Sequence, residues 1–343
     1  MRATLRALLA AVFSAGLLIA AVSVPAQADV VDEETAPKPR FITYNVCGAS
    51  STCEDRVGPA EKAEWRDAVV HAVDYWETDL VMLQEVCYEQ WKLLRDHLAN
   101  RSGVRYDTVW GAALPSAAGC ARWDPDPNDG VAPDLRFGLA IFAKGGPGTI
   151  DGSTRSVTFL PEPTNNPDYR PDPTKPPSPI NAENRILLCA KTLVAGRSVR
   201  ACNTHIDFNR DNTTAQIAQV AAITRGFAAA EPVVLAGDFN QSPQHADMNP
   251  LYDHGTGSTG VFREVDENDK DRFTGADCPQ TADRCRSGEP TATTACSEHT
   301  KSNKKIDYIF LSHHWSTTVR GDAVACSGVA DHHLLRGAAA WES

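Results

Sequence analysis

Short apolar runs of strand length are interspersed with three longer segments in which apolar residues recur every three or four positions. The helical spacing predicts helices over residues 61–77, 88–99 and 215–229. The short runs predict strands over 41–46, 80–86, 135–143, 185–193, 198–206, 232–239, 305–311 and 334–341. Strands outnumber helices and several are joined by hairpin-length turns, so the pattern indicates an α+β fold with antiparallel sheets covered by helices.

Two stretches between these elements lack either period. Residues 161–181 contain eight prolines in 21 residues, which predicts a surface loop. A linker between domains is the alternative, but an insertion is favoured because similar strands lie on both sides. Residues 241–304 are rich in Gly, Asp and Thr and contain three cysteines, which predicts a long loop held by disulfides.

The first 28 residues have the pattern of a secretory signal peptide. Arg2 and Arg6 precede an apolar run over 7–24, and the small-x-small sequence at 26–28 predicts cleavage before Asp29. A membrane anchor is the alternative, but the run is short and ends in a cleavage signal. Residues 29–40 are acidic and proline-containing, which predicts an unstructured arm, and residues 41–343 are expected to form one domain.

Composition and charge narrow the class of protein. The 343 residues are 42% apolar and 22% charged, which is typical of a globular chain with a sizeable core. The net charge of −11 argues against a strongly basic protein that wraps nucleic acid, although a local basic groove stays compatible with it. No second apolar stretch approaches membrane-spanning length, and we expect a monomer.

The chain has ten cysteines, all after residue 28, and an even count in an exported chain predicts disulfides. Cys189 and Cys202 lie opposite each other in a hairpin centred on residues 195–196, so they are predicted to be bonded. Local pairs are also plausible at 47/53 and 278/285. No Cys-x-x-Cys occurs, which argues against a zinc–cysteine site.

Polar residues follow the apolar strands at several points of the chain. For most of them taken singly, a turn or a structural contact is at least as good an explanation, but this is weak for Glu85, which follows its apolar run without a break. A charged residue at the end of a buried strand is nevertheless costly unless it is paired or metal-bound. Six such strand ends together predict a shared site that contains Asn45, Glu85, His205, Asp238, Asn240, Asp307, Asp331 and His332.

These residues lie in six motifs that resemble those of one superfamily. The motifs are Thr43–Val46, Leu83–Val86, Asn203–Asp207, Ala236–Asn240, Lys305–Phe310 and Ala330–His333. In this order they resemble the endonuclease/exonuclease/phosphatase (DNase I-like) superfamily, in a secreted bacterial-type form. The resemblance implies a four-layer α/β/β/α sandwich of two mixed sheets. The sequence departs from the family pattern at Ala330, where Ser is usual, and at Leu334, where Pro is usual.

The resemblance also implies roles for the site residues. Asn45, Glu85 and Asp331 would hold a divalent cation, Mg²⁺ or else Ca²⁺ or Mn²⁺, through hard oxygen ligands. Asp307 would orient His332, which would take a proton from the attacking water. The remaining catalytic residues would position the water and bind the phosphoryl oxygens, and these are His205, Asp238 and Asn240.

Substrate choice is less constrained than the chemistry. We expect a secreted, metal-dependent phosphodiesterase that hydrolyses nucleic acid by in-line water attack. A phospholipase C or sphingomyelinase-like enzyme, or a hydrolase of small phosphodiesters, is the alternative, but no obvious apolar membrane-docking loop is present. From another class, a catalytically silent binding module would be expected to lack site residues, and all of them are present here.

Overall fold

The computed structural model of the chain describes residues 31–50, 53, 59–161, 184–208 and 210–342. The predicted signal peptide and nearly all of the proline-rich loop lie outside the described residues. Two six-stranded sheets make up the centre of the described chain.

The first sheet has the strand order β11-β12-β1-β2-β4-β3. Its strands are β1 (Arg40–Asn45), β2 (Leu80–Cys87), β3 (Tyr106–Leu114), β4 (Phe137–Lys144), β11 (Trp315–Ala323) and β12 (Leu335–Trp341). The second sheet has the order β5-β6-β7-β8-β10-β9. Its strands are β5 (Ile150–Phe159), β6 (Ile186–Val194), β7 (Arg197–His205), β8 (Val233–Asp238), β9 (Arg263–Glu264) and β10 (Asp307–Leu311). Each sheet contains one parallel pair, β1/β2 and β7/β8, and is therefore mixed.

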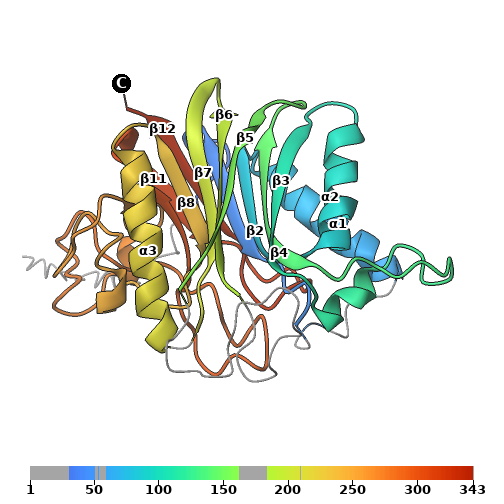
Figure 1. Cartoon of the computed structure of the whole chain (residues 1–343). Helices are drawn as coiled ribbons and strands as arrows, with labels where there is room; N and C mark the ends of the chain where they lie inside the picture. The colour runs from blue at the N-terminus through green and yellow to red at the C-terminus, as the bar shows by residue number, and fades with distance from the viewer. Residues whose placement is uncertain (1–30, 51–52, 54–58, 162–183, 209, 343) are drawn as a thin grey trace, which may run out of the picture.

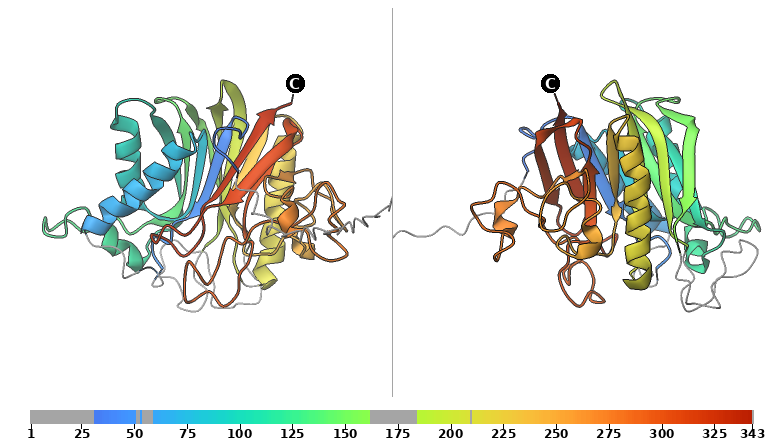
Figure 2. Two further views of the ribbon diagram at one scale, coloured as in Figure 1. Left: turned by 180° about the vertical axis from the view of Figure 1, so that it is seen from behind. Right: turned by 60° about the vertical axis from the view of Figure 1, so that its left-hand side comes forward.

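The helices cover the two outer faces of the sheet pair. Helices α1 (Pro59–Tyr75) and α2 (Tyr88–Asn100) lie on the first sheet, and α3 (Arg210–Ala228) lies on the second (Figures 1 and 2). This confirms the expected four-layer α+β sandwich. No helix in the described part of the chain is long and apolar enough to cross a membrane.

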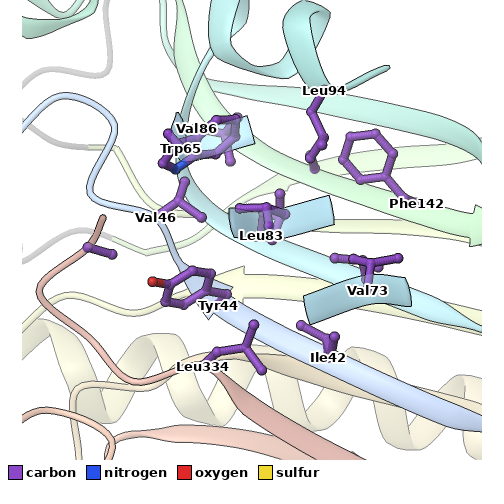
Figure 3. Packing of buried hydrophobic residues seen from close by; sticks show 14 of the residues in the cluster. Ile42, Tyr44, Val46, Trp65, Val73, Leu83, Val86, Leu94, Phe142 and Leu334 are labelled. Atoms are coloured by element: carbon purple, nitrogen blue, oxygen red, sulfur yellow. The ribbon is translucent and has the colours of Figure 1, made fainter. Parts of the chain in front are cut away.

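Three apolar clusters hold the layers together, and strand alternation assigns residues to them. In β1, Ile42 and Tyr44 pack toward α1 and α2 with Trp65 and Val73 (Figure 3). Phe41 packs between the sheets instead. Successive side chains of a strand point to opposite faces, so Thr43 and Asn45 share the inner face with Phe41. The third cluster lies between the second sheet and α3.

The predicted elements are all present with small shifts at their ends, but the sequence pattern missed strands. β3, β5 and β11 were not predicted, and β9 lies inside the stretch expected to be a loop. β5 is an edge strand whose side chains are mostly exposed or half-buried, so it lacks the apolar run that marks a buried strand.

The segment expected to be an unstructured arm is packed over the part that the structure describes. Val31 and Ala36 are buried, and Arg40 begins β1. Arg336 donates a hydrogen bond from Nη2 to the carbonyl of Val31 at 3.1 Å. The prediction of an unstructured arm, made from composition, is therefore wrong for residues 31–40, because their few apolar side chains pack on a core built by other elements.

All ten cysteines are placed in five disulfides. The predicted hairpin pair is confirmed, since Cys189 and Cys202 are directly opposite in the β6/β7 ladder and are bonded to each other. The two local pairs, Cys47–Cys53 and Cys278–Cys285, are also confirmed. The others, which the sequence left open, are Cys87–Cys120 and Cys296–Cys326.

Candidate active site

Four of the predicted site residues stand at strand ends on the inner faces of the two sheets. β7 and β8 are parallel and place His205 beside Asp238 in register. β10 runs antiparallel to β8, and its first residue, Asp307, is also paired with Asp238. Asn45 is the last residue of β1 in the facing sheet. This end of the sandwich points downward in Figure 1, toward the loops coloured orange-red.

Glu85 reaches the same place through a break in strand alternation. Val81 and Leu83 face the helices, so strict alternation would send residue 85 to that side as well. The β2/β4 register shifts between Leu83 and Val86, and Glu85 has a φ of 58°. Such a bulge re-aims a side chain, and here it turns the Glu85 carboxylate toward Asn45.

The Asn45 amide connects the two sheets at the site. Its Nδ2 donates to Oε1 of Glu85 at 3.0 Å and to Oδ2 of Asp238 at 3.2 Å. Its Oδ1 accepts from the backbone N–H of Cys47 at 3.1 Å, which fixes the orientation of the amide. Asn45 therefore holds carboxylates from different sheets at one point.

His332 and Asp307 form a close imidazole–carboxylate pair. His332 Nδ1 lies 2.8 Å from Asp307 Oδ2, and its Nε2 lies 3.8 Å from Asp238 Oδ2. Burial by itself would lower the pKa of His332, but the Asp307 carboxylate outweighs it, with help from Asp238 and Asp331, and raises that pKa to about 10. The pair gives His332 one fixed orientation with Nε2 turned toward Asp238.

The second imidazole has the opposite electrostatic environment. Burial, and then the positive charges of Arg185 and His332, lower the pKa of His205 well below its usual value. Its Nε2 lies 3.5 Å from Asp238 Oδ2 and 3.3 Å from Asn240 Nδ2. His205 is thus held as a neutral imidazole beside a carboxylate and an amide.

Asp238 lies at the centre of this arrangement and is almost fully buried. Burial and the charge of Asp307 raise the pKa of its carboxyl group to about 7. Its Oδ1 accepts from the backbone N–H of Asn240 at 2.8 Å. Asn240 has a φ of 49°, and its Nδ2 also donates to the carbonyl of Ile206 at 2.9 Å, so the turn after β8 is tied to the end of β7.

Asp331 lies at the edge of the group. Its carboxylate is within 4.8 Å of the sulfurs of Cys47 and Cys53, which are bonded to each other and so are not metal ligands. Its charge nevertheless helps to raise the pKa of His332. The residues that the structure brings into one constellation are Asn45, Glu85, His205, Asp238, Asn240, Asp307 and His332.

The donor set fits a hard divalent cation. Ligand atoms of Asp238, Asp307 and His332 lie within 4.8 Å of one another. Among the described residues the buried Oδ1 of Asp307 has no hydrogen-bond partner, and a cation would stabilise a buried carboxylate oxygen in this state. Burial, and then the negative charge of Asp307, raise the pKa of Asp238, and a bound cation would offset that charge. Oxygen ligands of this kind suit Mg²⁺, Ca²⁺ or Mn²⁺.

Gln84 and Asn203, two polar residues beneath the site, belong to the motifs, but the sequence analysis predicted no role for them. Gln84 donates from Nε2 to Asn203 Oδ1 at 2.7 Å across the sheets. Asn203 in turn donates to the carbonyls of Leu83 and Ala140, each at 2.9 Å. The available signal was a polar residue at an inward position of an otherwise apolar strand. This buried network fixes the spacing of the sheets next to Glu85 and His205.

A separate cavity of about 450 Å³ lies within residues 244–286 and contains none of the predicted site residues. Two of its lining side chains, Arg284 and Arg286, already serve the fold. Arg284 pairs with Asp253 and Glu267, and Arg286 donates to loop carbonyls, including that of His245 at 2.9 Å. The chemistry is therefore assigned to the strand-end constellation and not to this cavity.

Comparison with known proteins agrees with the geometry. A model of the Endonuclease/Exonuclease/phosphatase family matches residues 42–332. No curated protein sequence matches the chain significantly. The structure of an endonuclease/exonuclease/phosphatase from Bacteroides vulgatus is similar, with 19% sequence identity and a TM-score of 0.57. The matched region covers 88% of this chain and 98% of the Bacteroides chain.

Two further structures share the fold at low identity. A mannosyl-6-phosphatase of Bacteroides thetaiotaomicron is 15% identical with a TM-score of 0.56, covering 89% of this chain and all of its own. The human Nocturnin catalytic domain with bound sulfate is 15% identical with a TM-score of 0.54, covering 88% of this chain and 94% of its own. At these identities the likeness shows the fold alone.

Proposed function

The chain belongs to the endonuclease/exonuclease/phosphatase family, and from that premise we propose that it is an exported, metal-dependent phosphodiesterase that hydrolyses nucleic acid. Members of the family are phosphoric ester hydrolases and are generally dependent on a divalent metal. The observation that carries the proposal is the His332–Asp307 pair beside buried Asp238, because these are the groups that water attack on a phosphoester requires.

In this proposal His332 is the general base. Asp307 holds Nδ1, and a cation beside Asp307 and Asp238 would offset the negative charge that raises the pKa of His332, so that a neutral Nε2 could accept a proton from the attacking water. The positive charge that forms on the imidazole is stabilised by the 2.8 Å contact with the Asp307 carboxylate. No side chain is required as a covalent nucleophile.

The remaining residues orient the water and the phosphoryl group. Asp238 lies between the two imidazoles and is placed to orient the water, while the Asn240 amide is a donor for a phosphoryl oxygen. His205 contacts both Asp238 and Asn240, and it is placed to donate a hydrogen bond to the phosphate or to the leaving oxygen. Glu85 and Asn45 would hold the cation, with Asp238 and Asp307 close by and Asp331 at the edge of the group. When bound, that cation would neutralise charge that grows on the phosphoryl oxygens.

Two further residues support a polynucleotide substrate. Arg185 lies close enough to His205 to lower its pKa, and it lines a small recess together with His205 and Glu85. The guanidinium of Arg185 would supply positive charge for a phosphate there. Phe208 follows His205 by three residues in the chain and is 74% exposed, and an exposed ring near a phosphoester site would offer a face on which a base can stack. An acidic protein can bind nucleic acid when local positive charge and a cation offset its own net charge.

Export is part of the proposal. Five disulfides among the described residues are typical of a protein from an oxidising compartment, and they agree with the predicted signal peptide at residues 1–28. We expect a monomer.

Plasmid nicking by the oxidised protein tests the function. We expect nicking with Mg²⁺, none with EDTA, and a loss of about 10²- to 10⁴-fold in His332→Ala, the contribution usual for a general base. His313→Ala is the matched control, because His313 is exposed and lies beyond the other end of β10. Folded protein that does not nick DNA would refute the nuclease proposal. Turnover of lipid headgroup diesters, or of small phosphodiesters, would then reassign the substrate at the same site.

A further inference from the structure

The two halves of the His332–Asp307 pair come from separate segments that no strand pairing joins directly. Asp307 begins β10, and His332 lies in the loop before β12. A third segment, residues 291–293, lies between them. The backbone of Ala292 forms isolated bridges to both Lys304 and His332. This segment therefore contacts both the chain leading into β10 and the chain that carries the imidazole.

Thr291 hydrogen-bonds both to the chain that begins β10 and to the chain that carries His332. It is fully buried, and its Oγ1 accepts hydrogen bonds from the N–H of Ile306 at 3.1 Å and of Asp307 at 3.0 Å. Its carbonyl accepts from the N–H of His333 at 2.7 Å, one residue beyond His332. One threonine thus fixes the backbone of both members of the pair.

The far side of the segment is anchored as well. Thr293 Oγ1 lies 2.7 Å from Nε2 of His333, and Nδ1 of His333 lies 2.7 Å from the carbonyl of Val324. The Cys296–Cys326 disulfide joins the same two stretches of chain. These contacts leave the segment little freedom to shift relative to the loop that carries His332.

We infer that Thr291 is a positioning residue of the active site: its hydroxyl and its carbonyl set the distance between Asp307 and His332. The inference rests on the proposed function for its catalytic consequence, but not for its geometric content. Thr291 does not touch the reacting atoms, so it acts only through the pair. General-base catalysis is sensitive to such placement, and an error of about 1 Å can lower a rate about 10²-fold.

Two substitutions separate the hydroxyl from the shape of the side chain. Thr291→Val keeps the volume and removes the acceptor for two backbone N–H groups, whereas Thr291→Ser keeps the acceptor and removes a methyl group. We expect Val to lower kcat by roughly 10- to 100-fold with little change in KM, and Ser to stay within about threefold of wild type. Thr224→Val is the control, since Thr224 is equally buried but bonds to Val220 within α3.

A readout that needs no turnover distinguishes failure of this inference from failure of the proposed function. In isotope-labelled protein, the Nδ1 proton shared with Asp307 should give a downfield signal that is absent in His332→Ala. We expect Thr291→Val to shift or broaden that signal, and Thr291→Ser and Thr224→Val to leave it in place. If the wild type cleaves no phosphodiester, the proposed function fails, and this signal still decides the role of Thr291.

The inference is overturned if Thr291→Val keeps both the signal and the wild-type kcat and loses only thermal stability, as Thr224→Val should. If Thr291→Val does not fold, Thr293→Val and Thr293→Ser provide the second test. Thr293→Val removes the contact with His333 at the other end of the segment. We expect Val to lower kcat more than Ser does, and equal activity in the two would refute the positioning role of the segment.

Discussion

Replacing Asp307 by Asn tests whether the carboxylate acts through His332. The substitution keeps the size of the side chain and removes its charge. Asp307 is fully buried and its Oδ2 lies 2.8 Å from His332 Nδ1, so the contact is a charge-assisted hydrogen bond away from solvent. Hydrogen bonds to charged groups contribute about 1.5–3 kcal/mol. That energy corresponds to a loss of about 10- to 150-fold in rate if it is available only when the imidazole is charged.

The assay is a double-mutant cycle on the plasmid-nicking rate. We expect His332→Ala to cost about 10²- to 10⁴-fold and Asp307→Asn about 10- to 150-fold. The double variant should be no slower than His332→Ala, because Asp307 has no imidazole left to orient. Thermal unfolding of each variant checks that the fold is intact.

Additive losses would refute this reasoning. If Asp307→Asn slows the His332→Ala protein by the same factor as it slows wild type, Asp307 acts on the phosphate or on the cation and not through His332. A rate equal to wild type in Asp307→Asn alone would remove the pair from the mechanism.

Three further predictions concern the cross-links, the cation and the substrate. Replacing Cys296 and Cys326 together by Ser opens a bridge of sequence separation 30 and should lower the free energy of unfolding by about 3–4 kcal/mol, measured by denaturant titration of both proteins. Burial and the charge of Asp307 raise the pKa of Asp238 to about 7, so below that pH a proton competes with the cation. Affinity for Mg²⁺, measured by calorimetry, should fall by up to about tenfold per pH unit below 7 and level off above it, and affinity independent of pH between 5 and 8 would contradict this. Phe208→Ala should raise KM for DNA by about 5- to 150-fold, which is the loss in affinity expected when one base loses its stacking contact. Hydrolysis of a small aryl phosphodiester should be unchanged.

Much of the site followed from the position of polar residues at the ends of apolar strands, which is a local property of the chain. Asn45, His205 and Asp238 each come at the end of an apolar strand, on the face that the preceding inward residues define. Alternation along a strand puts each of them on the same face as those residues, but the packing of the two sheets identifies that face as the inner one. A second local argument predicted the Cys189–Cys202 bond, because the hairpin turn sets the register of the two strands.

Features that depend on contacts between distant segments could not be obtained in this way. The bulge at Glu85 reverses the face predicted by alternation, and the pairing of β2 with β4 decides where it falls. Val31 and Ala36 are buried because a core formed by other elements accepts them. The weakly patterned edge strand β5 exists because β6 offers it a ladder of hydrogen bonds.

The sequence by itself therefore determined the fold class, most of the elements and the residue types that meet at the candidate site. Only the tertiary structure decided how those groups meet: Asn45 joining carboxylates across two sheets, and Thr291 joining Asp307 to the His332 segment. The physical reason is the separation along the chain of the groups that interact. Side-chain direction within a strand is set by neighbouring peptide units, whereas a hydrogen bond between segments far apart in the chain forms only after packing has fixed both partners.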